Sequence, residues 1–257
     1  MTHTVRPAGW PARLAWAGFA LYLAYALSHL EFTPARFVAG LEFGRQFVAK
    51  LFPPDFHRWE LLVKGLKESL EMAILASVLG LLASLPVSLL GARNLMPAWI
   101  TWPARLVMVI CRSFHPVIVA IVFVKAVGFG ALAGILALTV ASVGFLGKLF
   151  TEAIEEISLK QVEAVRSTGA PFMSVVVFGV MPQVFARFIG FASYELDANL
   201  RNSTLVGIVG AGGIGGTLFA AFQRFDYDFV CAIILSIIAM IVVGEVLTNI
   251  VKRVFQA

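Results

Sequence analysis

Six stretches of this chain are long and apolar enough to lie within a lipid bilayer, and no other feature constrains its fold so strongly. A hydrocarbon core of roughly 30 Å requires about 20 helical residues. Inside that core every backbone amide must find a partner, which a helix provides within the span itself. The sequence therefore predicts an all-α integral membrane protein. Its six transmembrane helices are predicted at residues 14–30, 69–90, 103–127, 132–150, 182–206 and 229–251.

The amino-acid composition is also that of a membrane protein. Apolar residues make up 60% of the 257 positions and charged residues 14%, whereas soluble domains have roughly 45–50% and about 25%. The core of a soluble protein of this length could not hide so much hydrocarbon from water. Cys111 and Cys231 lie within apolar runs and lack the Cys and His spacing of a metal site. We therefore expect free thiols and no bound metal.

Two of the predicted spans are interrupted or polar. The third contains Arg112, His115 and Pro116, and Pro116 removes a backbone donor, so a kink or break is expected there. The fifth is the least hydrophobic. It carries a run of polar and charged residues: Glu195, Asp197, Asn199, Arg201, Asn202, Ser203 and Thr204. Ionisable groups at this depth mark candidate functional positions.

The distribution of basic residues predicts an orientation. Lysine and arginine gather in the loops on the cytoplasmic side of a membrane protein. With the N-terminus inside, most basic residues near the span ends fall in the cytoplasm, and the short outer loops receive only Lys125 and Arg224. We therefore expect both termini in the cytoplasm. Residues 31–67 depart from this rule, and the Pro53-Pro54 turn within them separates two amphipathic pieces, which predicts a helix at the membrane surface.

A polar loop, residues 151–178, separates the fourth and fifth spans. Its charged residues surround a short helix-compatible stretch at residues 163–169. That stretch ends at Gly169, a residue that can take the positive φ of a helix terminus. By charge alone, an ordinary solvated loop is the more common reading of such a segment, and a docking element for another protein is the alternative.

The order of residues in this loop resembles a known element. Glu163-Ala164, then Gly169, then Pro182 twelve positions after Ala170, are similar to the EAA loop in the membrane subunits of ABC importers. Val165 and Met181 stand where that loop usually has alanine and leucine. In those proteins the loop forms a coupling helix that rests in a groove of the ATPase. The resemblance assigns coupling to the ATPase to these residues: Glu163, Ala164, Arg166, Gly169 and Ala170.

Further segments resemble the phosphonate-transport permeases. They are residues 195–201, 203–207 and 209–215, together with 52–56, 126–130, 147–149 and 152–153. The resemblance covers the chain from about residue 50 to 253, and its glycine-rich segment is shared with methionine permeases. It implies the transmembrane domain of a type I, methionine-permease-like ABC importer. On this reading residues 1–68 form an N-terminal helix and outer amphipathic segment, and residues 69–257 form the transmembrane core.

The glycine-rich segment after the fifth span matches a nucleotide-binding pattern only by letters. Gly210, Gly212 and Gly215 have the spacing of a dinucleotide fingerprint, but no strand–helix–strand unit surrounds them. Glycine does allow close backbone approach and a turn. We therefore expect tight packing at the end of the fifth span, at a gate of the permeation path. The residues concerned are Gly207, Gly210, Gly212, Gly213 and Gly215.

The polar run of the fifth span has two interpretations. Asp197 and Arg201 are four residues apart on one helix face, so a structural ion pair is one of them. In the other, Arg201 lines a path for an oxyanion, because its forked donors match phosphonate oxygens. Neutral donors would assist it: Asn199, Asn202, Ser203 and Thr204. Arg112, Ser113 and His115 would complete the surface, although a histidine beside a proline is more often structural.

No residue pattern indicates bond-making chemistry. Gly147-Lys148 lacks the spacing of a phosphate-binding loop, so we expect no catalytic residue and no cofactor in this chain, with ATP and Mg²⁺ bound by a partner. The resemblance implies a permease subunit of an ATP-driven importer for phosphonates, phosphite or phosphate in a bacterial inner membrane. Its implied partners are an ATPase dimer, a periplasmic binding protein and a second copy of itself, with no nucleic acid.

A different class of function remains open at this point. An ion-coupled secondary transporter or channel would use Glu195, Asp197 and Arg201 as a relay within the membrane. It would leave residues 163–169 without a role, and the two halves of the chain show no inverted repeat of the kind that secondary transporters often have. A membrane-embedded enzyme lacks a candidate nucleophile. The importer is therefore the leading interpretation.

Overall fold

The computed structural model describes residues 9–29 and 33–256, with the side chains of Pro34 and of residues 251–256 left out. Every regular element in these residues is a helix, which confirms the predicted all-α class. The chain forms two compact units, residues 1–52 and 53–257.

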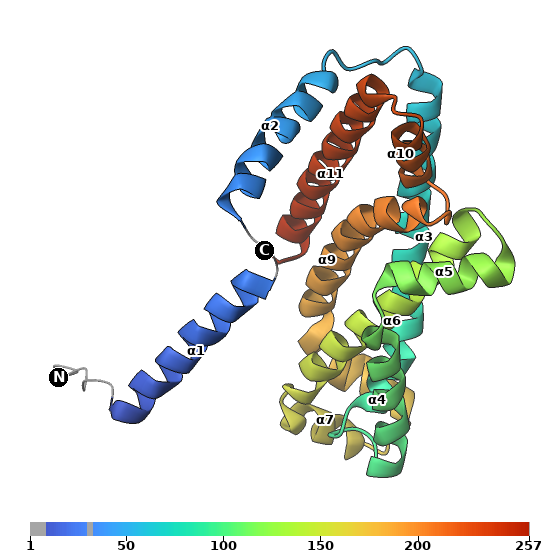
Figure 1. The fold of residues 1–257 in the computed structure, drawn as a ribbon. Helices are drawn as coiled ribbons and strands as arrows, with labels where there is room; N and C mark the ends of the chain where they lie inside the picture. Colours follow the sequence, from blue (N-terminus) through green and yellow to red (C-terminus); the bar gives the residue numbers. More distant parts are fainter. Residues whose placement is uncertain (1–8, 30–32, 257) are drawn as a thin grey trace. The chain divides into compact units, whose positions relative to one another are not determined.

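The smaller unit contains two helices, α1 (Trp10–His29) and α2 (Pro34–Lys50) (Figure 1). Thr33 caps α2 by accepting a hydrogen bond from the Arg36 N–H at 3.4 Å. The predicted first span, 14–30, falls on α1, and its last residue lies outside the described part. Among the described helices α1 is long enough to cross a membrane but not apolar enough. Arg13, Tyr22, Tyr25 and His29 dilute its apolar surface, so the predicted count of six spans is not confirmed.

The larger unit contains the helices that can cross a membrane. Within the described residues four helical segments are long and apolar enough: Trp59–Gly91 (α3), Ala131–Glu155 (α6), Phe172–Ile208 and Tyr227–Ile250 of α11 (Tyr227–Gln256). A fifth span is made if α4 (Ala98–Ser113) and α5 (Pro116–Val127) are counted together, although they are bent by 92°. The break predicted at Pro116 is therefore confirmed. A shorter apolar helix, α10, runs over Ile214–Gln223.

Two helices begin earlier than their apolar runs. The helix α3 begins at Trp59, ten residues before the predicted span at 69, and it includes the exposed Lys64 and Lys67. Hydropathy identifies the part of a helix that lies in lipid, whereas the hydrogen-bonded helix continues into water. The second amphipathic piece predicted after the Pro53-Pro54 turn is thus the first part of α3. The predicted boundary at residue 68 lies within α3, and the division into functional domains stays a prediction.

The helix of the fifth span also begins early, at Phe172, and has an unusual turn before its proline. It consists of α8 (Phe172–Val175), a π-helical turn η1 (Val176–Val180) and α9 (Met181–Ile208). In the π turn the Met181 N–H donates to the Val176 carbonyl, five residues back. Pro182 has no N–H to donate, so the regular ladder is interrupted at this point.

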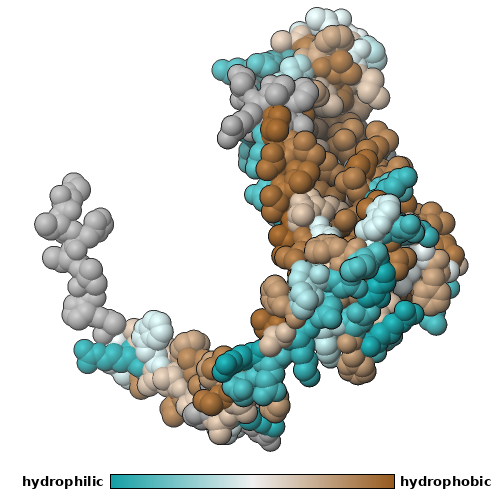
Figure 2. Space-filling view, turned by 90° about the horizontal axis from the view of Figure 1, so that it is seen from above, coloured by the Kyte–Doolittle hydropathy of each residue, from teal (hydrophilic) through white to brown (hydrophobic). Residues whose placement is uncertain are grey.

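Small residues let the long helices approach one another around α6, which contacts α3, α4, α5 and α9. A Cβ added at Gly144 would lie 2.9 Å from the backbone nitrogen of Arg112 on α4. One buried cluster includes Phe150 and Phe188, whose stacked ring centroids are 3.9 Å apart. Many large apolar side chains remain exposed, and Figure 2 shows hydrophobic residues over much of the visible face of the larger unit. Such a surface suits lipid.

Candidate functional site

The short helix α7 (Leu159–Arg166) lies in the polar loop between α6 and α8 (Figure 1). Val162 is its buried residue and faces the π turn, where a Cβ added at Gly179 would lie 3.3 Å from the Val162 Cα. Gly169 has the predicted positive φ, 76°. The remaining predicted coupling residues are Glu163, Ala164 and Arg166, which are exposed, and Ala170, which is half-buried. The solvated face of α7 is therefore free for a partner.

The end of α6 beside α7 is joined to the corner between α3 and α4. Glu155 binds the Arg105 guanidinium at 2.6 Å and accepts the Arg93 N–H at 2.8 Å. The Asn94 amide donates to the Ile154 carbonyl at 2.7 Å. The Arg93–Glu155, Arg105–Glu155 and Asn94–Ile154 bonds join residues that are 62, 50 and 60 positions apart in sequence. The α7 end of the larger unit is thus cross-linked by hydrogen bonds.

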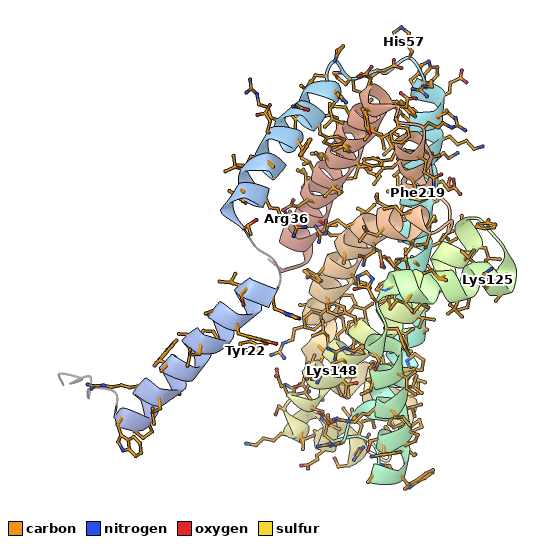
Figure 3. All side chains as sticks on the ribbon, viewed as in Figure 1. Tyr22, Arg36, His57, Lys125, Lys148 and Phe219 are labelled. Carbon is orange, nitrogen blue, oxygen red and sulfur yellow. The ribbon has the colours of Figure 1, made fainter. Side chains whose placement is uncertain are left out.

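The opposite end of the larger unit is closed by a polar turn before α3. His57 lies at this end and Lys148 in the other half (Figure 3). The Asp55 N–H donates to the Asp228 carbonyl at 3.1 Å, and Arg58 pairs with Asp226 at 2.6 Å. Hydrogen bonds from the His57 backbone and ring lower the pKa of the Asp55 carboxyl. The start of α11 is thereby held next to the start of α3.

The polar run of α9 is divided between two helix faces, since residues two positions apart point in nearly opposite directions. On the buried face, Glu195 accepts a hydrogen bond from the Ser142 hydroxyl at 2.5 Å. The Asn199 amide donates to the hydroxyls of Ser142 at 2.9 Å and Ser77 at 3.0 Å. We call these four residues the polar cluster. It connects α9 with α6 and α3 in the interior of the helix bundle.

On the other face of α9, Arg201 pairs with Asp197 at 2.7 Å. The Asp197 side chain is 14% exposed and the Arg201 side chain 45%. One carboxylate oxygen of Asp197, Oδ1, is buried and has no hydrogen-bond partner among the described residues. The Asp197–Arg201 ion pair, one of the two interpretations of the sequence, is therefore present, and the Arg201 side chain remains partly exposed.

The neutral residues predicted for the anion path have different surroundings. Ser203 is buried and donates to the Leu200 carbonyl of its own helix at 2.8 Å. Thr204 is buried, and its hydroxyl has no partner within the described structure. Asn202 is half-buried. Asn199 belongs to the polar cluster, although its carbonyl oxygen also lacks a partner in the described chain.

The three residues predicted from the third span lie at the elbow between α4 and α5. Ser113 donates to the Val109 carbonyl at 2.7 Å, and the His115 ring accepts the Val117 N–H at 3.3 Å, so both serve the local backbone. Arg112 is exposed. Nothing in the described residues joins this group to Arg201 by a hydrogen bond or an ion pair. A common anion surface made of both groups stays a prediction.

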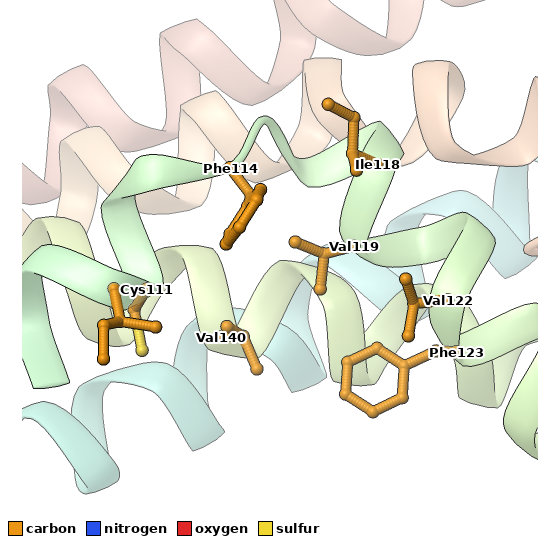
Figure 4. Close-up of a pocket in the computed structure, with 8 residues that line it drawn as sticks. Cys111, Phe114, Ile118, Val119, Val122, Phe123 and Val140 are labelled. Atoms are coloured by element: carbon orange, nitrogen blue, oxygen red, sulfur yellow. The ribbon is translucent and has the colours of Figure 1, made fainter.

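Two clefts flank this elbow. The first, of about 310 Å³, is apolar and lies between the elbow and α6 (Figure 4). It is lined by Ile110, Cys111, Phe114, Ile118, Val119, Val122, Phe123 and Val140. The second, of about 170 Å³, contains Arg112 with the ion pairs Arg105–Glu155 and Lys148–Glu152. Only the second has charged groups that can bind an anion.

The glycine segment forms a tight turn between α9 and α10. Three of its glycines adopt positive φ: Gly210 at 90°, Gly212 at 85° and Gly213 at 77°. An added Cβ at Gly215 would collide with the Thr204 carbonyl, and one at Gly207 would lie 2.9 Å from the Gly215 Cα. Side chains are therefore excluded where α9 and α10 meet. A role for this turn in gating stays a prediction.

Four residues with specific contacts were not assigned to the coupling helix, the anion path or the glycine turn: Ser77, Ser142, Glu195 and Gln183. Glu195 is visible in the sequence as a charge within an apolar span, which is a signal by itself. A serine in an apolar helix is not, because it can bond to its own backbone, as Ser77 does to Ala73 at 2.7 Å. Its partners become known only from the packing.

Residues 76–257 match the family described as binding-protein-dependent transport system inner membrane component. The chain belongs to this family. It is a multi-pass inner-membrane protein and the permease subunit of an ABC importer, a non-catalytic component that implies an ATPase partner and a substrate-binding protein. The predicted class of function is confirmed, and the secondary transporter or channel is not favoured.

Individual relatives add detail to the family match. The chain is 40% identical over 205 residues to the phosphite transport system permease protein PtxC of Stutzerimonas stutzeri, covering 79% of this chain and 74% of that one. It is 36% identical over 202 residues to the phosphate-import permease protein PhnE of Mycolicibacterium smegmatis, covering 78% of this chain and 38% of the relative.

A solved structure shares the fold of this permease. A chain of the MetNI methionine ABC transporter superposes with a TM-score of 0.69 at 23% identity, covering 78% of this chain and 99% of that one. The predicted methionine-permease-like fold is therefore confirmed.

Proposed function

We propose that this permease carries phosphite, a phosphonate or a related phosphorus oxyanion across the bacterial inner membrane at the expense of ATP. The observation that carries the proposal is the 40% identity, over 79% of the chain, to a permease named for phosphite transport. The relative named for phosphate import points to the same chemical class. The substrates of those proteins share a phosphorus centre with two or more anionic or polar oxygens.

In this proposal α7 is the docking helix for the ATPase. Val162 anchors α7 on the π turn, and the exposed residues Glu163, Ala164 and Arg166 are available to a partner. The ATPase binds ATP and Mg²⁺, and this chain needs neither. Closure of the ATPase moves α7, and the spans then rock between arrangements open to opposite sides of the membrane.

Arg201 is the proposed contact for the oxyanion. Its guanidinium is oriented by Asp197 at 2.7 Å, and the Arg201 side chain as a whole is 45% exposed. A guanidinium has five N–H donors, so one ion pair leaves donors for an anion. Asp197 balances much of the positive charge. A transport path requires binding weak enough for release, and a neutralised arginine provides that. Asn202 and Thr204 lie on the same segment of α9 and supply neutral donors, whereas Arg112 lies in a separate cleft.

The proposed assembly contains two copies of this chain, two ATPase subunits and one periplasmic binding protein, with both termini of the permease in the cytoplasm. The support for the orientation is the excess of lysine and arginine in the predicted cytoplasmic loops. The α7 loop lies on the same predicted side as the termini, where ATP is available.

Co-purification tests the importer against an ion-coupled transporter. A tagged form of this chain is expressed with the products of its neighbouring genes and purified in a mild detergent. We expect an ATPase to co-elute and its ATP hydrolysis to rise when binding protein loaded with phosphite is added. A stable oligomer of this chain alone, with no bound ATPase, would contradict the proposal.

A further inference from the structure

Gln183 makes a set of hydrogen bonds that fastens α7 to the membrane helix. Its side-chain oxygen Oε1 accepts the Ser158 N–H at 2.9 Å. Its side-chain nitrogen Nε2 donates to the Ser158 carbonyl at 3.3 Å and to the Gly179 carbonyl at 2.7 Å. The side-chain amide of Gln183 thus pairs with both backbone polar groups of Ser158, the residue immediately before α7.

The π turn creates the place where this pairing occurs. Gly179 lies in that turn, one turn before Gln183, and its lack of a Cβ admits the backbone of α7 at Val162. Pro182 offers no N–H, so the chain around it has carbonyls available for side-chain donors. The Gln183 amide donates to the Gly179 carbonyl, which lies in the π turn. The π turn that interrupts the regular helix is therefore also the place where α7 packs against the membrane helix.

Two other contacts hold the segment that runs from the end of α6 through α7. Arg187 pairs with Glu156 at 2.6 Å, but their side chains are 53% and 66% exposed, and ion pairs in such positions contribute little. Val162 contributes apolar burial, which resists lifting of α7 but does not fix its direction. The two hydrogen bonds between Gln183 and the backbone of Ser158 do fix a direction, since both partners are held at one peptide segment.

We propose that Gln183 is a positioning residue that holds the start of α7 on α9, so that a displacement of α7 by the ATPase is passed to the membrane helix. The inference rests on the proposed function for its account of coupling. The hydrogen bonds from Gln183 to Ser158 and Gly179, which we call the clip, lie within the permease and do not depend on its substrate. The long helix from Phe172 to Ile208 then carries the displacement from α7 to the glycine turn.

The test compares variants that remove the clip with variants that leave it intact. Gln183→Met preserves the length of the side chain and removes all three hydrogen bonds. Ser158→Ala is the local control, because the Ser158 side chain makes no capping bond and the clip uses only its backbone. Gln223→Met is the chemical control, since the Gln223 side chain is exposed at the end of α10 and forms no hydrogen bond with the described residues.

The first measurement is amide hydrogen exchange of the full-length permease in lipid nanodiscs. Gln183→Met should speed exchange at residues 156–162 by about fivefold, the factor that corresponds to one net hydrogen bond. Ser158→Ala and Gln223→Met should not change it. Unchanged exchange in Gln183→Met would show that the Gln183 hydrogen bonds do not hold the start of α7. This outcome does not depend on which substrate the complex transports.

The second measurement is phosphite transported per ATP hydrolysed by the complete complex in proteoliposomes. Gln183→Met should lower this ratio at least about threefold while the ATPase remains bound, and both controls should match the wild type. Faster exchange with an unchanged ratio would overturn the role in transmission. Failure of the wild-type complex to transport phosphite would overturn the proposed substrate, and the exchange result would still decide the clip.

Discussion

Gly215 shows how closely the chain approaches itself where α9 meets α10. An added Cβ would collide with the Thr204 carbonyl, a backbone atom that cannot move aside as a flexible side chain would. Gly215→Ala should therefore lower the melting temperature of the purified protein, at a cost of about 1–3 kcal/mol. Gly216→Ala is the control, because its Cβ would lie 3.5 Å from the Gly207 carbonyl. Equal melting temperatures for the two variants would contradict this packing.

Variants of Asp197 and Arg201 distinguish a structural role of this ion pair from a role of Arg201 in transport. Arg201→Ala leaves the Asp197 carboxylate unpaired, and an unpaired charge at this depth costs at least ~2.5 kcal/mol. The double variant Asp197→Ala/Arg201→Ala should recover its melting temperature. If Arg201 binds the anion, phosphite uptake by the double variant should still fall by about tenfold, the equivalent of one charge-assisted hydrogen bond. Recovery of uptake in the double variant would leave Arg201 as half of a structural ion pair.

At the scale of one helix, α7 depends on how it ends. Gly169 has a φ of 76° and nothing within 4 Å of an added Cβ, so a substitution there alters the backbone and not the packing. Gly169→Val should insert normally but lower transport per ATP, because a β-branched residue resists positive φ. Gly169→Asn should retain more coupling, since asparagine tolerates that conformation. Equal coupling ratios in Gly169→Val and wild type would argue against docking through α7.

The polar cluster joins three membrane helices, and Asn199 is at its centre. Asn199→Leu removes its hydrogen bonds to Ser77 and Ser142. In membranes such bonds contribute about 0.6 kcal/mol each on average, so unfolding in detergent and denaturant should show a loss of roughly 1 kcal/mol. Asn202→Leu is the control, because the Asn202 side chain, also on α9, forms no hydrogen bond with any described residue. An equal loss of stability in Asn202→Leu would mean that the hydrogen bonds of the polar cluster make no specific contribution to stability.

The elements differ in how well the sequence predicts them. The break at Pro116 was predictable because a missing N–H has a local consequence. The early start of α3 at Trp59 was not, because the charged first turns lie outside the apolar run. The positive φ of Gly169 was predictable because helices commonly end at a glycine in the left-handed conformation. The pairings of Ser142 with Glu195 and of Gln183 with Ser158 join residues 53 and 25 positions apart, and no local pattern encodes them.

For the whole molecule, the sequence indicated a membrane protein through composition alone, and the family through the order of a few residues near Gly169 and Gly215. The relative positions of Arg112 and Arg201 could not be obtained in this way, because spans three and five are predicted independently of their packing. The structure assigns Arg112 to a cleft with Lys148 and Glu155. The anion path proposed here therefore depends on α9.

We propose that ATP hydrolysis by a partner drives this permease to import a phosphorus oxyanion. Uptake of labelled phosphite is measured in proteoliposomes that contain the complete complex, with ATP inside and loaded binding protein outside. We predict accumulation that requires both ATP and the binding protein and that continues after a protonophore has collapsed the proton gradient. Uptake that proceeds without ATP and stops when the gradient is collapsed would contradict the account.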